Sequence, residues 1–174
     1  MKEKIRMSLH LGCGNIYNES KGKEKWINLD KMRTVKADVY HDLDEYPYPF
    51  APNTFDYIYS QGLLEHVEDV IKHLEEIWRI SKKGAIVEYK VPHSMSQNSF
   101  TDFTHKHTFT EYSMALVCDN LEGNLYIQGK FDLLEVQKIK GQMGKLFPEF
   151  INRKICHVIE EVYQFIIFKL VVKK

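Results

Sequence analysis

A short apolar strand that runs into two glycines restricts the fold of this chain more than any other feature of its sequence. Residues 5–11 have the pattern of a buried strand, Gly12 and Gly14 follow, and a second strand, 25–29, ends at Asp30. Glycine reaches positive φ angles and lets a ligand approach the backbone closely. A carboxylate at the tip of the next strand is where nucleotide-binding sheets accept hydrogen bonds from ribose hydroxyls. The pair predicts an α/β protein with a nucleoside-containing ligand.

A dinucleotide does not fit this turn. The pyrophosphate fingerprint G-x-G-x-x-G needs a third glycine where this chain has Tyr17, and residues 18–23 read as a polar loop instead of a helix start. A nucleoside without a phosphate, such as S-adenosylmethionine, fits better. The alternative interpretation is a tight strand-to-loop turn that binds nothing.

Composition limits the class of protein. A chain of 174 residues has room for one domain, 1–174, and its net charge of zero gives no reason to expect a nucleic-acid partner. The longest apolar run, 165–172, is too short to span a bilayer and contains Lys169, so no membrane segment is expected. The three cysteines are odd in number and form no C-x-x-C motif, which favours a reduced, cytoplasmic protein; they are Cys13, Cys118 and Cys156.

Seven apolar segments alternate with helical or polar ones, which favours a largely parallel sheet. They are 5–11, 25–29, 37–41, 55–60, 85–91, 130–139 and 164–172. The clearest helix lies between the fourth and fifth of them, with apolar residues at helical spacing from Val67 to Trp78. We expect it to close at Lys82, Lys83 and Gly84. Glu65 and His66 either open this helix or act in a site.

The first crossover is unusually short. Residues 15–24 are few and hydrophilic, whereas a connection between parallel strands normally contains a helix. A stunted first helix would leave part of one sheet face thinly covered, and such a face is commonly buried by a partner. On this argument a homodimer is an expected partner arrangement.

Six motifs in order carry a resemblance to a known family. They are L-x-L-G-C-G at 9–14, W-x-N-L-D at 26–30, H-D-L at 41–43 followed by P-Y-P-F at 47–50, L-E-H at 64–66, V-P-H at 91–93 and D-x-x-H-K at 102–106. Through these motifs the chain resembles the class I S-adenosylmethionine-dependent methyltransferases, in particular a small group of methyltransferases that are similar to type 11. The resemblance implies a Rossmann-like methyltransferase fold, with a seven-stranded, mostly parallel sheet and an antiparallel strand at the C-terminus.

The resemblance also implies roles for residues. Gly12 and Gly14 would line the methionine and ribose portion of the cofactor, Asp30 would hold the ribose hydroxyls, and Asp42 with Leu43 would lie at the adenine. The residues from Ser60 to Gly62 would face the sulfonium. The family usually has an acidic or amide residue in place of His10 and often a glycine in place of Ile16. The full predicted cofactor set is His10, Gly12, Cys13, Gly14, Asp30, Asp42, Leu43, Ser60 and Gln61, although Cys13 also suits a small packing role.

A polar segment rich in histidine follows the fifth strand. We expect residues 93–128 to form a lid or substrate insertion, because long loops in compact domains often bind ligands. If the segment is extended, His105 and His107 project from the same side. Three interpretations compete for it: a substrate or catalytic site, a metal site made by His93, Asp102, His105 and His107, and histidines that make only structural hydrogen bonds.

The predicted function is transfer of a methyl group from S-adenosylmethionine to an oxygen or nitrogen nucleophile of a small-molecule acceptor. The enzyme's tasks are to align the nucleophile, exclude water and remove a proton. Histidine titrates in the right range for the last task, and the candidates are His66, His93, His105 and His107. The alternatives are a non-catalytic binding module of the same fold and a methyltransferase that acts on protein or nucleic acid.

Overall fold

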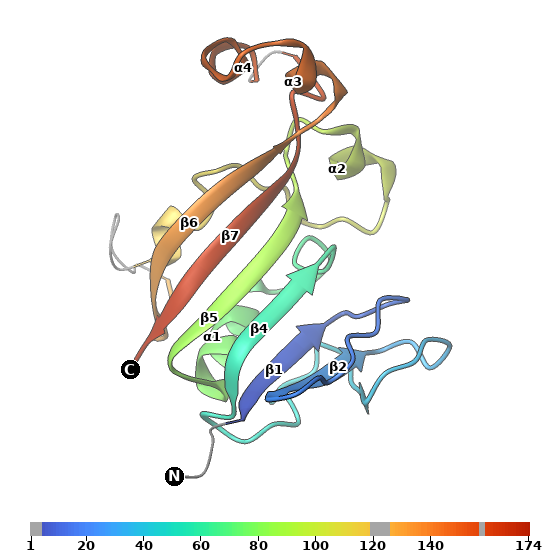
Figure 1. The fold of residues 1–174 in the computed structure, drawn as a ribbon, viewed down its shortest axis with the longest axis vertical. Coiled ribbons are helices and arrows are strands. Elements are labelled where there is room, and N and C mark those ends of the chain that lie inside the picture. The colour runs from blue at the N-terminus through green and yellow to red at the C-terminus, as the bar shows by residue number, and fades with distance from the viewer. Residues whose placement is uncertain (1–4, 119–125, 157–158) are drawn as a thin grey trace.

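The structure, a computed structural model, describes residues 5–118, 126–156 and 159–174. Its centre is a seven-stranded sheet with the strand order β3-β2-β1-β4-β5-β7-β6 (Figure 1). The strands are β1 (Arg6–Leu11), β2 (Glu24–Asp30), β3 (Val39–Tyr40), β4 (Phe55–Gln61), β5 (Ser81–Pro92), β6 (Lys130–Lys140) and β7 (Tyr163–Lys173). β1 to β5 pair in parallel, whereas β7 runs antiparallel to both β5 and β6. The predicted α/β fold with its antiparallel C-terminal strand is confirmed.

The expected helix after β4 exists, but its predicted ends are wrong. Helix α1 (Val70–Ile80) begins at Asp69, whose side chain accepts a hydrogen bond from the backbone N–H of Lys72. Glu65 and His66 therefore lie in a turn before the helix and do not open it. The helix ends at Ser81, where the chain enters β5 at once. Residues 82–84 consequently belong to the strand and do not close the helix.

Helix α1 covers one face of the sheet. Its buried residues Leu74, Ile77 and Ile80 join Ile58 and Val87 in the hydrophobic core. Figure 1 shows the helix behind β4 and β5, and no helix among the described residues lies in front of them. Residues 12–23, all of which the structure describes, contain no helix, so the stunted first crossover is confirmed. The homodimer inferred from this bare face stays a prediction.

Short helices occupy the two C-terminal connections. Helix α2 (Gln97–Thr101) and the 3₁₀ helix η1 (Ala115–Val117) lie between β5 and β6, and α3 (Gln142–Leu146) and α4 (Glu149–Ile155) lie between β6 and β7. An isolated bridge joins His93 to Phe109, so the segment after β5 leaves the sheet and returns to it. Residues 119–125 of the predicted insertion 93–128 lie outside the described residues, and its role as a lid stays a prediction. Among the residues that the structure describes, no helix is long and apolar enough to cross a membrane.

Candidate active site

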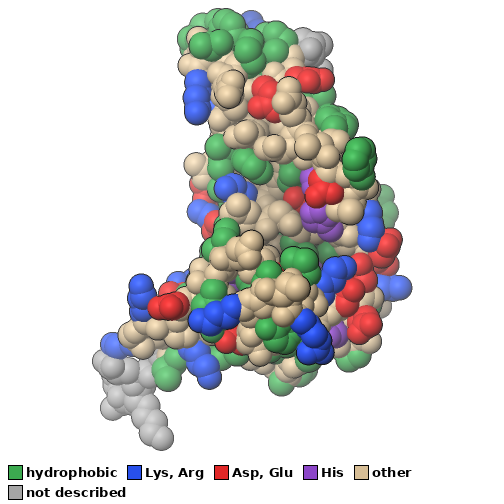
Figure 2. All heavy atoms as spheres, turned by 90° about the vertical axis from the view of Figure 1, so that its right-hand side faces the viewer, with side chains coloured by type: hydrophobic (Ala, Val, Ile, Leu, Met, Phe, Trp, Pro, Cys, Tyr) green, Lys and Arg blue, Asp and Glu red, His purple; other side chains and the backbone are tan. Residues whose placement is uncertain are grey.

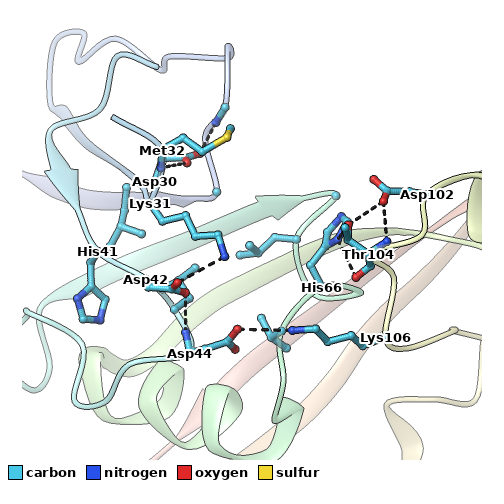
Figure 3. Close-up of a pocket in the computed structure, with 17 residues that line it drawn as sticks. Asp30, Lys31, Met32, His41, Asp42, Asp44, His66, Asp102, Thr104 and Lys106 are labelled. Carbon is cyan, nitrogen blue, oxygen red and sulfur yellow. Dashed lines mark hydrogen bonds and ion pairs between the residues drawn. The ribbon is translucent and has the colours of Figure 1, made fainter. Parts of the chain in front are cut away.

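A pocket of about 620 Å³ lies at the carboxyl ends of the central parallel strands. Its wall combines the glycine turn after β1, the end of β2, the residues after β3, the turn after β4 and the segment 102–106 (Figure 3). Ligands in open α/β sheets bind at this edge, where successive strands end together. Figure 2 looks onto this side of the molecule and shows histidine side chains next to acidic ones beside a hollow.

The glycine turn forms one wall of the pocket. Gly12 and Gly14 both line it and have positive φ angles of 62° and 51°. A β-carbon on Gly14 would meet no protein atom within 4 Å, so this glycine leaves free volume at the pocket wall. A β-carbon on Gly12 would lie 3.0 Å from the side chain of Leu63, another lining residue. Both glycines thus allow the positive φ angles of the turn, and Gly14 in addition leaves space in the pocket.

Asp30 connects this turn to the end of β2. Its carboxylate is almost fully buried and accepts hydrogen bonds from the backbone N–H of Gly14 at 2.8 Å and of Met32 at 2.9 Å. Each bond uses a different oxygen, so each oxygen keeps acceptor capacity for a ligand. The carboxylate lines the pocket and is fixed in orientation before any ligand binds.

Asp42 and Leu43, which follow β3, also line the pocket. Asp42 accepts a hydrogen bond from the backbone N–H of Asp44 and lies 3.4 Å from the ammonium of Lys31, as Figure 3 shows. The Lys31 side chain is largely exposed, so this ion pair is weak and can yield to a ligand. The Leu43 carbonyl accepts a hydrogen bond from the buried Tyr48 hydroxyl, which fixes the backbone at this wall.

Four predicted cofactor residues do not line the pocket. His10 lies against the rings of Trp26 and Tyr59, and Cys13 is buried next to the Lys36 carbonyl. Burial lowers the pKa of His10 and raises the pKa of the Cys13 thiol to about 11. Ser60 is buried, and the Gln61 side-chain carbonyl accepts a hydrogen bond from the Tyr59 hydroxyl. The remaining predicted cofactor residues all line the pocket; they are Gly12, Gly14, Asp30, Asp42 and Leu43.

His66 is the one predicted catalytic histidine that lines the described pocket. Its Nδ1 lies 2.9 Å from the Thr104 hydroxyl, which in turn donates to the Asp102 carboxylate at 2.7 Å. Figure 3 shows these three side chains together on the side of the pocket away from Asp30. Burial is the main cause that lowers the pKa of His66, and the neighbouring His105 adds to it. A neutral imidazole is therefore favoured at neutral pH.

The other three predicted histidines do not line the pocket. His105 Nδ1 is 3.0 Å from the Ser99 carbonyl, and its Nε2 faces Glu65. His107 Nε2 is 3.0 Å from the Val67 carbonyl. His93 is buried, and its Nδ1 accepts a hydrogen bond from the backbone N–H of Met95. Among the described residues, no group of three close metal-ligand atoms contains His93, His107 or Asp102, so the structure does not assemble the metal-ligand set considered from the sequence.

Sequence reasoning missed several lining residues. Lys31, Met32, Asp44 and Lys106 all line the pocket, and Lys106 forms ion pairs with Asp44 and with Glu68. Lys31 and Met32 follow Asp30 directly, so their position after the strand tip was an available signal. The approach of Lys106 to Asp44 links segments that are far apart in the sequence, and no local pattern predicts it.

The residues present fit S-adenosylmethionine. The buried Asp30 carboxylate has acceptor capacity for ribose hydroxyls, Gly14 leaves space for a ligand, and Leu29 and Leu43 add apolar surface. The lining residues include no cluster of cations that would bind a phosphate chain, since both lysines, Lys31 and Lys106, pair with carboxylates.

Comparisons with known proteins agree with this geometry. Residues 9–88 match the sequence model of a family described as a methyltransferase domain. No curated protein sequence matches the chain. Among solved structures, the chain is similar to one in the complex between the Haloferax volcanii Trm112 methyltransferase activator and a methyltransferase. The TM-score is 0.67 at 15% identity, over 99% of this chain and 84% of that one.

Two further solved structures have the same fold. An S-adenosylmethionine-dependent methyltransferase from Archaeoglobus fulgidus has a TM-score of 0.66 and 16% identity, over 98% of this chain and 86% of that one. Phosphoethanolamine N-methyltransferase 2 of Haemonchus contortus, in complex with phosphomonomethylethanolamine and S-adenosylhomocysteine, has a TM-score of 0.64 and 18% identity; the match covers 100% of this chain and 50% of that one. The match over residues 9–88, the strand order and the similarity to these structures show that the chain has the fold of the class I S-adenosylmethionine-dependent methyltransferases, and the pocket lies where an open α/β sheet binds its ligand.

Proposed function

We propose that the protein transfers a methyl group from S-adenosylmethionine to an oxygen or nitrogen atom of a small-molecule acceptor. One observation carries the proposal: a single pocket of about 620 Å³ reaches from Asp30 to His66 and the segment 102–106. That volume is typical of sites that enclose one small ligand. Once a cofactor lies along the glycine turn, the remaining space suits a small acceptor group better than a folded macromolecule.

The pocket residues divide into two groups in this proposal. Gly12, Gly14 and Asp30 hold the amino-acid and ribose portions of the cofactor, and Asp42 and Leu43 lie at its adenine. When bound, S-adenosylmethionine supplies a methyl group already activated by its sulfonium. The protein's share of the reaction is then to orient both partners and to exclude water.

The acceptor end of the pocket is formed by His66, Asp102, Thr104 and Lys106. The Asp102–Thr104–His66 hydrogen bonds hold the imidazole in one orientation, and Lys106 is held by Asp44 and Glu68. A polar, prearranged wall of this kind suits a nucleophile that carries a hydroxyl or amino group. The general-base role considered for His66, His93, His105 and His107 stays a prediction, and only His66 has the pocket position that direct contact with an acceptor requires.

The experiment uses S-adenosylmethionine with an isotopically labelled methyl group. The protein is incubated with this donor and a cell extract that has been separated into a low-molecular-mass filtrate and retained macromolecules. We expect enzyme-dependent label in the filtrate, and much less label from Asp30→Ala when the donor concentration is near the wild-type Kd. Label confined to retained protein or nucleic acid would overturn the small-molecule proposal, and no transfer in either fraction despite cofactor binding would favour the non-catalytic module.

A further inference from the structure

A carboxylate and two imidazoles meet at the acceptor end of the pocket, which one of the two imidazoles, His66, lines. One donor atom each from Glu65, His66 and His105 lies within 4.8 Å of the other two. Glu65 Oε1 is 4.0 Å from His105 Nε2, and the two histidine rings are 4.6 Å apart in an edge-to-face arrangement. No other group of three such donors with this spacing occurs in the described ranges of the chain.

Neighbouring groups determine which nitrogen of each histidine is free to bind a cation. The Ser99 carbonyl can only accept, so His105 Nδ1 carries the proton in that 3.0 Å hydrogen bond, and Nε2 keeps its lone pair. The Thr104 hydroxyl gives its one proton to Asp102 and therefore accepts from His66 Nδ1. In the neutral form, His66 Nε2 keeps its lone pair as well. Metal-binding histidines are held in this way, with the second nitrogen donating to an oxygen.

Glu65 supplies the third donor, and its position is fixed by the backbone. Its carbonyl accepts hydrogen bonds from the backbone N–H of Lys106 at 2.7 Å and of His107 at 3.2 Å, which clamps the turn after β4 to the segment that carries His105. The side chain is 2% exposed, and its Oε2 has no hydrogen-bond partner among the described residues. Leaving a buried carboxylate oxygen without a partner is energetically costly, and coordination of a metal ion removes that cost.

We propose that Glu65, His66 and His105 bind a zinc ion at the acceptor end of the pocket. Two imidazoles and one carboxylate form a donor set that zinc accepts, and three protein ligands leave a further coordination position for water or substrate. Zinc bonds of about 2.0–2.2 Å place tetrahedral ligand atoms roughly 3.5 Å apart, so the 4.0 Å pair of Glu65 and His105 needs only a small closure.

The zinc site would narrow the class of acceptor. His66 lines the pocket, so an ion held by it lies at the wall where the proposed acceptor binds. Zinc in an open site polarises a bound oxygen and lowers its pKa. This statement about the acceptor rests on the proposed function. An acceptor with an oxygen atom that can bind zinc, such as a hydroxyl or carboxylate, is then favoured. Zinc binding itself does not depend on that function.

The test is metal binding to the protein alone, without a polyhistidine tag. Metal-free protein is titrated with zinc chloride by calorimetry and with cobalt(II) by visible absorption, which reports four-coordinate geometry. We expect one ion per chain. Glu65→Gln and His105→Ala should each weaken zinc binding at least about 10-fold, because a loss of that size is usual even for residues that only support the ligands. His107→Ala is the matched control, because this histidine lies in the same segment but outside the cluster, and it should bind zinc as the wild type does.

Cofactor titration of the same variants separates the two proposals. Glu65→Gln should still bind S-adenosylmethionine, which shows that the variant is folded and that any loss of zinc is local. If the wild type binds no zinc, or if His107→Ala loses zinc as Glu65→Gln does, the assigned site is wrong. Zinc binding without methylation of any small molecule would leave the site intact and overturn the proposed function.

Discussion

Replacing Asp30 with alanine tests the cofactor half of the pocket. The carboxylate accepts hydrogen bonds from the backbone N–H groups of Gly14 and Met32 and lines the pocket at the end of β2. Hydrogen bonds to a charged group contribute about 1.5 to 3 kcal/mol each. Alanine removes both hydrogen bonds, but water from the pocket can bind the exposed N–H groups in part. We therefore expect the free energy of unfolding to fall by about 2 to 4 kcal/mol, which is less than twice the largest value for one bond.

The affinity for S-adenosylmethionine should fall as well. Loss of one charge-assisted hydrogen bond to the ribose costs about 1.5 to 3 kcal/mol, which is roughly 10- to 150-fold in Kd. Isothermal titration with S-adenosylhomocysteine measures the affinity, and urea denaturation measures stability. A variant that is destabilised but binds the ligand within threefold of the wild type (about 0.7 kcal/mol) would refute the assigned contact.

Asp56→Ala is the matched control for this experiment. Asp56 also accepts a hydrogen bond from a backbone N–H, that of Met7, and forms an ion pair with Lys82. It lies near the start of β4, whereas the pocket is formed at the strands' carboxyl ends. We therefore expect Asp56→Ala to lower stability and to leave cofactor affinity unchanged. A similar loss of affinity in both variants would mean that global destabilisation, and not the ribose contact, weakens binding.

Three further predictions concern the turn, the core and the acceptor wall. Gly12→Ala should lower the free energy of unfolding by roughly 1 to 2 kcal/mol because of its positive φ alone. The loss should be larger than in Gly22→Ala, because an added β-carbon meets a leucine side chain at Gly12 and has open space at Gly22. Urea denaturation of both variants measures the two losses. Burial lowers the pKa of His73 to about 4, below the unfolded value near 6.5, so the unfolded chain binds more protons between these values. Stability should therefore fall by about 3 kcal/mol as the pH drops from about 6.5 to 4; denaturation across this range should show a slope that His73→Asn reduces, and an unchanged slope would contradict the assignment. Thr104→Val removes the hydroxyl that lies 2.9 Å from His66 Nδ1 and leaves only the more distant Thr104 carbonyl, at 3.3 Å, to hold the ring. It should lower turnover by about 10-fold or more while cofactor affinity stays constant; equal loss of both quantities would show that this contact only supports the fold.

The sheet could be predicted from the sequence because each strand is a distinct apolar run bounded by polar or turn residues. The end positions of α1 could not, because Val67 continues the apolar pattern although it packs in the core from a turn. Its true start depends on the Asp69 cap. Helices α3 and α4 have only five and seven residues, too few for a periodic pattern to stand out.

Of the predicted cofactor residues, those that line the pocket lie at or just after the carboxyl end of a strand, where the sequence pattern could place them; they are Gly12, Gly14, Asp30, Asp42 and Leu43. His10 stands within β1, and strand alternation turns its side chain away from the face that buries Leu9 and Leu11, toward the rings of Trp26 and Tyr59 on the neighbouring strands.

The cluster of Glu65, His66 and His105 was not predictable from local sequence pattern. His105 meets Glu65 and His66 only because backbone N–H groups of Lys106 and His107 bind the Glu65 carbonyl, some 40 residues earlier in the chain. The metal-ligand set considered from the sequence, His93, Asp102, His105 and His107, shares only His105 with the observed cluster. The choice of partners depends on a tertiary contact that no motif encodes.

A crystal structure of the protein with S-adenosylhomocysteine would show whether the pocket binds the cofactor in the assigned way. We expect density in the pocket of Figure 3, with the ribose hydroxyls on Asp30, the adenine beside Asp42 and Leu43, and the sulfur directed toward His66. Density for the ligand outside this pocket, the reverse orientation within it, or an empty pocket at saturating ligand would contradict the assigned cofactor site.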